Sequence, residues 1–225
     1  MNDTTNFFKK IKMHHLSIPE SIASDLRSKI MIGNLKGGDQ LKQDYLAQQY
    51  GVSVSALREA LKILEGEDLV SFLPNRGALI TKLSAEEALN IFDIRIMLET
   101  GALGLAIPKL TDDHLKRAKA LLDEEAHCDD PIQYNRINSE FHELLYEASD
   151  NVQLLDIIRT LHNNVGRYLV FYLDKMQFKE QSHREHKEIL KACKEKDTTG
   201  AKRLLKQHMQ HAGKCLADYL KMHEE

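Results

Sequence analysis

The chain has 225 residues, of which 42% are hydrophobic and 29% are charged, and its formal net charge is −3 at pH 7. This length allows one large domain or two smaller ones, and no apolar run approaches the roughly 20 residues that a membrane-spanning helix needs. The N-terminus lacks the apolar core of a signal peptide. The three cysteines, Cys128, Cys193 and Cys215, match neither a disulfide framework nor a metal knuckle, so we expect reduced thiols in a cytoplasmic protein.

The first elements along the chain are an arm and a helix. Residues 1–15 are largely polar, and we expect them to form a flexible N-terminal arm. A helix is predicted over Pro19–Ile32, because proline suits a first helical turn and Ile22, Leu26 and Ile30 recur at helical spacing.

Residues 43–64, with the sequence QDYLAQQYGVSVSALREALKIL, predict two helices joined by a tight turn. Gly51 stands where the chain must turn sharply, often with a positive φ. Ser53 follows as the N-cap of the second helix. Apolar residues line one face of each helix. The pattern is that of a helix-turn-helix, whose second helix is of the kind that enters a DNA major groove.

Two short β-rich runs follow, at residues 69–73 and 78–81, with a turn at 74–77 between them. Two strands after a helix-turn-helix predict a winged helix-turn-helix domain over residues 16–82. Residues 1–82 carry 11 Lys and Arg against 9 Asp and Glu, whereas the remainder carries 20 against 25. The slight basic excess lies on the side of the winged helix, as contact with phosphates requires.

Residues 83–225 show only helical patterns. Ser84 and Glu87 form a capping box at the start of this region. The predicted helices cover about 84–107, 111–127, 131–149, 151–176, 179–195 and 198–223, and short loops join them. The fold class is therefore mainly α, with an N-terminal winged helix-turn-helix and a C-terminal antiparallel six-helix bundle.

The two halves together resemble the GntR family of bacterial transcription regulators, in the group with an all-helical FCD-type effector domain. The resemblance covers about Pro19–Tyr219 and is closer to the shorter VanR-type branch than to the FadR-type branch. In the DNA-binding half it rests on Leu41, Leu46-Ala47, Gly51-Val52-Ser53, Arg58-Glu59-Ala60-Leu61, Leu64-Glu65, Leu69-Val70 and Asn75-Arg76-Gly77-Ala78. In the effector half it rests on Arg95, Leu98-Glu99, Glu140-Phe141-His142, Glu185-His186, Ile189, Ala192 and His208.

Arg58 is the main candidate for reading DNA, because a guanidinium one turn into the second helix can bind guanine or clamp a phosphate. The alternative is an ordinary surface arginine paired with Glu59 or Glu65. The other candidate DNA contacts are Lys42, Ser53, Ser55, Lys62, Asn75, Arg76 and Gly77. The alternative interpretation of Ser53 is a helix cap alone. The alternative for Arg76-Gly77 is a simple hairpin turn.

Two positions depart from the family pattern. Val54 and Asp44 stand where the family usually has arginines that commonly touch DNA. Valine cannot hydrogen-bond a base edge, although its methyl groups could contact a thymine methyl. The usual operator sequence of the family is therefore not expected here, and Lys42 and Lys62 are possible compensating cations.

A second constellation consists of histidines. Asn138 and His142 share one helix face, and His186 and His208 can face each other across an antiparallel helix pair. Three imidazoles and one oxygen would make a divalent-metal site, whereas the alternative is a set of satisfied polar core residues. His183 and His211, each three residues from a proposed ligand, are interpreted as surface histidines, with a place in the lining of the pocket as the alternative.

The resemblance implies metal binding, because many members of this group bind Zn²⁺, Ni²⁺ or Mn²⁺ through an Asp and three His at these positions. Here Asn138 replaces the Asp, so we expect a lower affinity, with Zn²⁺ or Ni²⁺ as the best match to imidazoles. Arg95 could bind the carboxylate of a small effector. Its alternative role is a salt bridge with Glu99.

These features predict a homodimeric, ligand-responsive transcription regulator that is not an enzyme. It would bind an operator in double-stranded DNA and a small, acidic metabolite. Two other interpretations are a helical-bundle metal enzyme and an interaction module that has lost DNA binding. The second is favoured by Val54 and Asp44.

Overall fold

The computed structural model describes residues 16–173 and 178–222. The predicted N-terminal arm and the last three residues of the predicted helix 151–176 lie outside these residues. Two compact units meet in the sequence at Lys82 and Leu83, and each has its own hydrophobic core. Within the described ranges, no helix is long and apolar enough to cross a bilayer.

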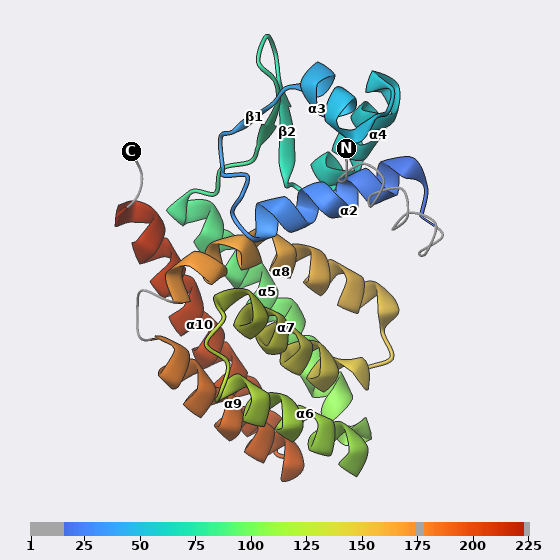
Figure 1. Ribbon diagram of the computed structural model, residues 1–225. Helices are drawn as coiled ribbons and strands as arrows, with labels where there is room; N and C mark the ends of the chain where they lie inside the picture. The colour runs from blue at the N-terminus through green and yellow to red at the C-terminus, as the bar shows by residue number, and fades with distance from the viewer. Residues whose placement is uncertain (1–15, 174–177, 223–225) are drawn as a thin grey trace. The chain divides into compact units, whose positions relative to one another are not determined.

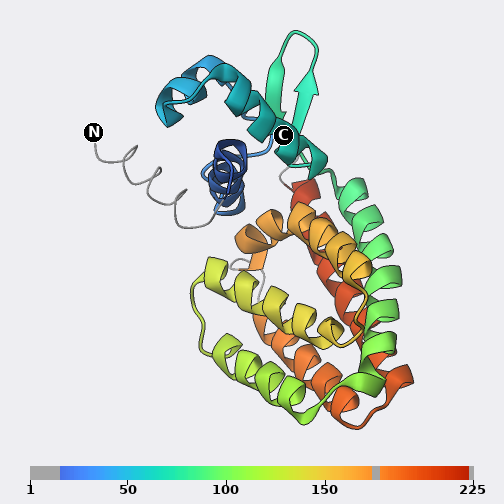
Figure 2. The ribbon, with the colours of Figure 1, turned by 90° about the vertical axis from the view of Figure 1, so that its right-hand side faces the viewer.

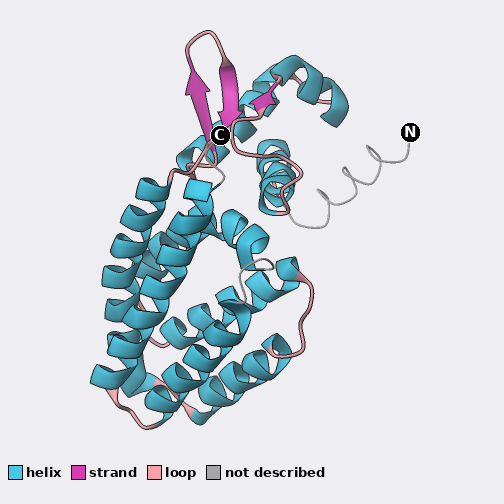
Figure 3. Ribbon diagram, turned by 90° about the vertical axis from the view of Figure 1, so that its left-hand side faces the viewer, coloured by secondary structure: helices cyan, strands magenta, loops and turns pink. Residues whose placement is uncertain are grey.

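The described part of the N-terminal unit consists of helices and a small sheet (Figure 1). Its order is α2 (Ile18–Met31), β1 (Gln40–Leu41), α3 (Gln43–Tyr50), α4 (Val54–Gly66), β2 (Val70–Leu73) and β3 (Gly77–Ile80). The sheet is antiparallel with strand order β1-β3-β2, and Figure 3 shows the hairpin of β2 and β3 beside the helices. The predicted helix-turn-helix and wing are present. The sequence did not predict β1, which has two residues and pairs with β3.

Local signals explain where the helices of this unit begin and end. Ser17 and Glu20 form a capping box at the start of α2. Gly51 ends α3 with φ of 66°, a conformation that favours glycine. The Ser53 hydroxyl then accepts a hydrogen bond from the Ala56 amide, 3.2 Å away, and caps α4. The turn between the two helices is thus fixed by the residues that predicted it.

Over residues 83–173 and 178–222, the C-terminal unit contains six long helices, as the sequence predicted (Figure 2). They are α5 (Ala85–Ala106), α6 (Asp112–Glu125), α7 (Pro131–Glu147), α8 (Val152–Leu173), α9 (Phe178–Lys194) and α10 (Thr198–Met222), with a short 3₁₀ turn, η1 (Ile107–Lys109), after α5. A capping box at Ser84 and Glu87 starts α5. Asp130 caps α7 through the amides of the first turn. The mainly helical fold class is confirmed.

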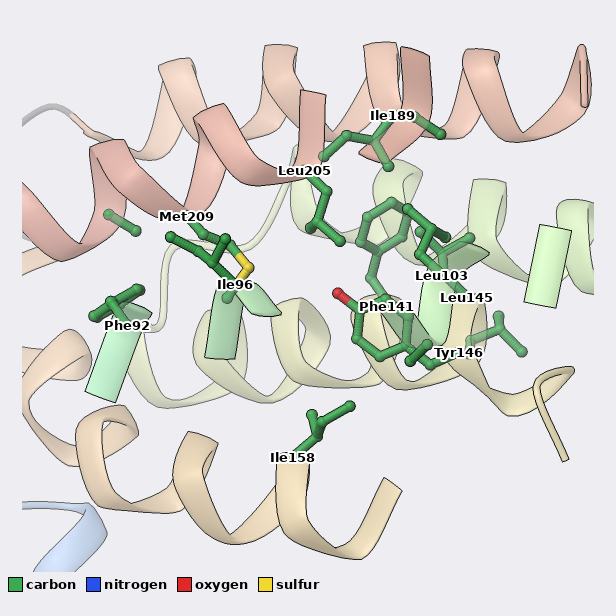
Figure 4. Packing of buried hydrophobic residues seen from close by; sticks show 14 of the residues in the cluster. Phe92, Ile96, Leu103, Phe141, Leu145, Tyr146, Ile158, Ile189, Leu205 and Met209 are labelled. Atoms are coloured by element: carbon green, nitrogen blue, oxygen red, sulfur yellow. The ribbon is translucent and has the colours of Figure 1, made fainter. Parts of the chain in front are cut away.

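The core of this unit lies between α5, α7, α9 and α10. Figure 4 shows Phe141 and Tyr146 of α7 at its centre, packed among Leu103, Ile189 and Leu205 from the other three helices. This packing brings polar side chains of α7, α9 and α10 into the interior, because they share helix faces with the core residues.

Helices α5 and α10 approach each other closely at Gly213. A Cβ atom at this position would lie 2.8 Å from the Phe92 ring. Only glycine leaves room for the ring, so this residue sets the distance between the two helices at that point.

Candidate functional site

The second helix of the helix-turn-helix, α4, exposes the groups predicted to contact DNA. Arg58 is exposed, and its Nε donates to Oε1 of Gln43 on α3 at 3.2 Å. The predicted alternative, a salt bridge with Glu59 or Glu65, does not occur among the described residues. A neutral amide holds the guanidinium, so its positive charge stays available to an anion.

The remaining candidates on this unit are also at the surface. Ser53, Ser55, Lys42 and Lys62 are exposed, and neither lysine forms an ion pair with another described residue. The departures from the family pattern are exposed as well. Val54 is 39% exposed, and Asp44 lies in the first turn of α3. Tyr45 on α3, which the sequence did not single out, is 59% exposed.

The tip of the wing is an exposed turn formed by Asn75, Arg76 and Gly77. Asn75 and Gly77 both have positive φ, at 62° and 71°, which accounts for these residue types at a tight hairpin. The carbonyl of Arg76 accepts a hydrogen bond from Nε2 of Gln40 at 2.6 Å. The wing tip is therefore anchored while its arginine side chain remains exposed.

In the helical unit, His142 of α7, His186 of α9 and His208 of α10 come together in the interior. One ring nitrogen from each of them lies within 4.8 Å of the others. Nε2 of His186 and Nε2 of His208 are 3.2 Å apart. The three side chains are between 0% and 5% exposed. The fourth predicted ligand, Asn138, lies one turn before His142 and lines a small cavity together with His142 and His208.

This cavity measures about 30 Å³. It has room for an ion or for one or two water molecules, but not for a metabolite. Its polar lining includes Arg95, Asn138, His162 and Ser182. His162, on α8, lies 3.4 Å from the hydroxyl of Ser139, and burial lowers its pKa to about 3. Sequence spacing gave no signal for His162 or Ser182.

In two histidines of the cluster, the outer ring nitrogen, Nδ1, faces a carboxylate. Nδ1 of His186 lies 3.0 Å from Glu125 of α6, and Nδ1 of His208 lies 2.8 Å from Glu185 of α9. Burial alone would raise the pKa of each carboxyl, but the hydrogen bonds outweigh it. The pKa of Glu125 is therefore lowered, and that of Glu185 falls to about 2. Both groups are ionised at neutral pH.

The two histidines interpreted as surface residues are part of this network. Nδ1 of His183 lies 2.7 Å from the second oxygen of Glu125, and its side chain is only 16% exposed. The surface interpretation of His183 was therefore wrong. Nδ1 of His211 lies 2.7 Å from the second oxygen of Glu185, with a half-exposed side chain. Each glutamate contacts a cluster histidine with one oxygen and a second histidine with the other. Sequence spacing does not reveal this second contact, which explains the error.

His142 has a different outer partner. Its Nδ1 lies 3.2 Å from the hydroxyl of Tyr146, one turn along α7. That hydroxyl donates to Glu99 of α5 at 2.8 Å. Glu99 in turn forms a buried salt bridge with Arg95, at 2.7 Å. Arg95 therefore has the salt bridge that was one of its two predicted roles, and it lines the cavity as well.

The donor set fits a divalent transition-metal ion. Imidazoles bind Zn²⁺ and Ni²⁺ well when they are neutral. Burial, with the charges of neighbouring histidines adding to it, lowers the pKa of His142 well below its usual value and that of His208 to about 4. His142 and His208 are therefore neutral and able to coordinate at neutral pH, and carboxylates behind ligand histidines are a common feature of metal sites.

A larger groove of about 580 Å³ runs over α6, α7 and α8. Its charged rim is largely paired, because Arg159 contacts Glu143 and Arg117 contacts Glu147. Its floor is apolar, from residues such as Leu144 and Ile158. The groove shares only Tyr146 with the network behind the histidines.

Two family models match the chain. The model described as "Bacterial regulatory proteins, gntR family" matches residues 19–80, and the FCD domain model matches residues 90–211. The first covers the winged helix, and the second covers the helices that carry the histidine cluster.

Similar proteins match over most of the chain, including both parts. The HTH-type transcriptional regulator McbR of Escherichia coli is 29% identical over 205 residues, which are 88% of this chain and 92% of McbR. The HTH-type transcriptional repressor GlaR of the same organism is 29% identical over 196 residues, 82% of this chain and 89% of GlaR. A solved structure of McbR aligns with a TM-score of 0.77 at 26% identity, over 91% of this chain and 99% of that one.

Proposed function

Because the chain belongs to the GntR family and carries an FCD domain, we propose that it is a metal-assisted, carboxylate-responsive, homodimeric repressor or activator of transcription. Its relatives are DNA-binding transcription regulators, and that general role is also the role of this chain. The observation that carries the metal-dependent part is the convergence of three buried imidazoles in the region matched by the FCD model.

For DNA binding we propose contacts from the start of α4 and from the wing. Arg58 would bind a base edge or a phosphate. Ser53, Ser55 and the exposed amides at the start of α4 would bind phosphates. Lys42 and Lys62 would add positive charge, and Asn75-Arg76-Gly77 would reach the backbone or the minor groove. Val54 and Asp44 would give an operator unlike that of most relatives.

For the metal we propose Zn²⁺ or Ni²⁺, held by His142, His186 and His208, with Asn138 as a weaker oxygen ligand. A bound ion would supply positive charge and an open coordination position for an oxygen ligand. The cavity of about 30 Å³ is too small for a metabolite. The effector would therefore bind a more open state, with its carboxylate directed to the ion and to Arg95.

An enzymatic role is less consistent with the cluster. A metal hydrolase needs a general base beside the metal-bound water. The nearest carboxylates, Glu125 and Glu185, each accept from two histidines and face the outer side of the imidazoles. Their basic oxygens are therefore already engaged.

The proposed dimer partner is a second copy of this chain, so that each copy would bind one half of a two-part operator. On α5, Ile94, Met97 and Leu105 lie on one helix face and are 48%, 74% and 53% exposed. Gly101 lies on the same face, and a Cβ at this position would meet nothing within 4 Å. Figure 2 shows α5 along an outer edge of the helical unit. An apolar helix face with a glycine at its centre suits close packing against a symmetry-related helix.

The test is selection of DNA from a random pool, followed by a salt titration of the selected site. We expect a palindromic site, with an affinity that falls steeply as salt rises. Arg58→Ala should abolish selectivity, whereas Arg184→Ala, at an exposed position of α9, should not. A pool without enrichment, both with and without added Zn²⁺, would contradict the proposed DNA reading.

A further inference from the structure

Each histidine of the cluster has a carboxylate behind its outer nitrogen. For His186 it is Glu125, and for His208 it is Glu185. For His142 it is Glu99, reached through the hydroxyl of Tyr146. The three carboxylates come from α6, α9 and α5, so the arrangement does not follow from any one helix.

The hydrogen-bond chemistry fixes the orientation of all three imidazoles. An ionised carboxylate can only accept, so Nδ1 of His186 and of His208 must carry the hydrogen. The Tyr146 hydroxyl has a single hydrogen and donates it to Glu99. It must therefore accept from Nδ1 of His142. Each neutral imidazole then presents the lone pair of Nε2 on its other side, which is the tautomer a metal ion requires.

Two carboxylates beside the cluster, Glu125 and Glu185, form no ion pair with a lysine or arginine among the described residues. Glu99 is neutralised by its salt bridge to Arg95, in which both side chains are nearly inaccessible. Glu125 and Glu185 each contact two imidazoles, Glu185 also accepts from the amide of Gln181, and the Tyr134 hydroxyl interacts with Glu125. A doubly positive ion at the cluster would be attracted by both carboxylates.

We infer that Glu125 and Glu185 are positioning residues for the metal: they hold His186 and His208 in the ligating tautomer and supply the ion's buried counter-charge. Glu99 fixes the tautomer of His142 through Tyr146, and His183 and His211 hold Glu125 and Glu185 in place. This inference rests on the proposed metal binding. It accounts for how a site with a neutral amide, Asn138, in place of an acidic ligand can retain a divalent ion.

The experiment compares the Zn²⁺ affinity of the full chain with that of charge-removing variants. Glu125→Gln and Glu185→Gln keep the side-chain shape but remove one charge each. Competition with a chromophoric chelator gives each dissociation constant. We expect about 10–100-fold weaker binding for each variant, as is typical for loss of such an outer partner. Glu188→Gln, the same change at an exposed position of α9, should leave the affinity unchanged.

A second readout separates positioning from general stability. The absorption spectrum of the Co²⁺-loaded protein reports ligand geometry, and it should change in Glu125→Gln and Glu185→Gln but not in Glu188→Gln. Tyr146→Phe should also change it, because Nδ1 of His142 then loses its acceptor. Thermal melting of the metal-free variants checks the fold. If Glu125→Gln does not fold, Glu185→Gln carries the test, because the Glu185 side chain is 19% exposed against 1% for Glu125.

Each outcome decides a different question. Wild-type affinity and an unchanged Co²⁺ spectrum in both variants would overturn the inference and leave the proposed metal binding intact. Failure of the wild-type protein to bind Zn²⁺ or Co²⁺ would overturn both. Equal losses in Glu188→Gln would show a general effect of charge, and would also overturn the positioning role.

Discussion

Met97 is the most exposed of the large hydrophobic side chains on the described surface, and its truncation tests the proposed dimer face. Complete burial of a methionine side chain contributes about 1.5–3 kcal/mol. The side chain is already partly covered by its own chain and remains 74% exposed. A partner that covers the rest would therefore gain about 1–2 kcal/mol from each copy.

Two-fold symmetry doubles the effect of the substitution, because each copy contributes one Met97 to the same interface. Met97→Ala should therefore weaken the dimer by about 3 kcal/mol, which corresponds to roughly 100-fold in the dissociation constant. Sedimentation of the metal-free protein over a dilution series measures this constant directly. The free energy of unfolding of the monomer should hardly change, since the side chain is mostly in solvent.

Met222→Ala is the matched control. It truncates the same side chain on α10, where Met222 is 66% exposed. If Met222→Ala weakened the dimer as much as Met97→Ala, the loss would not be specific to α5. A dimer constant unchanged in Met97→Ala would refute the assignment of the interface to this face of the helix.

Four further outcomes are expected. Gly213→Ala should lower the melting temperature by several degrees, because a Cβ only 2.8 Å from the Phe92 ring overpacks the contact of α5 and α10 at about 1–3 kcal/mol. Gly101→Ala should stabilise the monomer by about 0.5–1 kcal/mol, since its Cβ meets open space, and yet weaken the dimer in the same sedimentation assay. Arg58→Ala should cost about 1–3 kcal/mol of operator affinity in a fluorescence titration. Loss of sequence preference at one base position would indicate contact with that base. A smaller dependence of affinity on salt would indicate contact with a phosphate. Zn²⁺ at 1,000 times its dissociation constant should stabilise the helical unit by about 4 kcal/mol and raise its melting temperature by about 10 °C, an increase that a chelator should reverse.

The sequence predicted those parts of the fold that depend on nearby residues. Gly51 and Ser53 defined the turn and the cap of the helix-turn-helix, and Ser84 and Glu87 marked the start of α5, because each acts on backbone groups within one turn. Strand β1 was not predicted. It has two residues, and its extended form depends on pairing with β3, far away in the sequence.

The candidate metal site was predictable only in its inner part. His186 and His208 could be paired because they lie on consecutive antiparallel helices. Glu125 is 61 residues from His186, and its side-chain contact arises from the packing of α6 against α9. No local pattern distinguishes it from the exposed Glu124 beside it. Glutamates are normally solvated, so only the three-dimensional structure shows which of them is buried against an imidazole.

Helix α5 links the proposed metal site of the C-terminal unit to its proposed dimer face. Glu99 is 1% exposed and reaches His142 through Tyr146, whereas Met97 is 74% exposed. Residues two apart on a helix point in nearly opposite directions, so one side of α5 contacts the network behind the cluster while the other forms the proposed dimer face. The same helix begins at Ala85, three residues after the winged-helix unit ends at Lys82.

A ligand can shift such a protein between two states only if it binds them with different affinities. In this chain the difference can arise at the Tyr146 hydroxyl, which accepts from His142 only while it donates to Glu99. An effector that shifted His142 would move this hydrogen-bonded pair with it, because packed interiors change between discrete arrangements rather than deform continuously. The helix that would respond is α5, because it carries Glu99, whose side chain is fixed by the buried salt bridge with Arg95 one turn away. Effector binding would thus reach the dimer face without any contact between the effector and the partner.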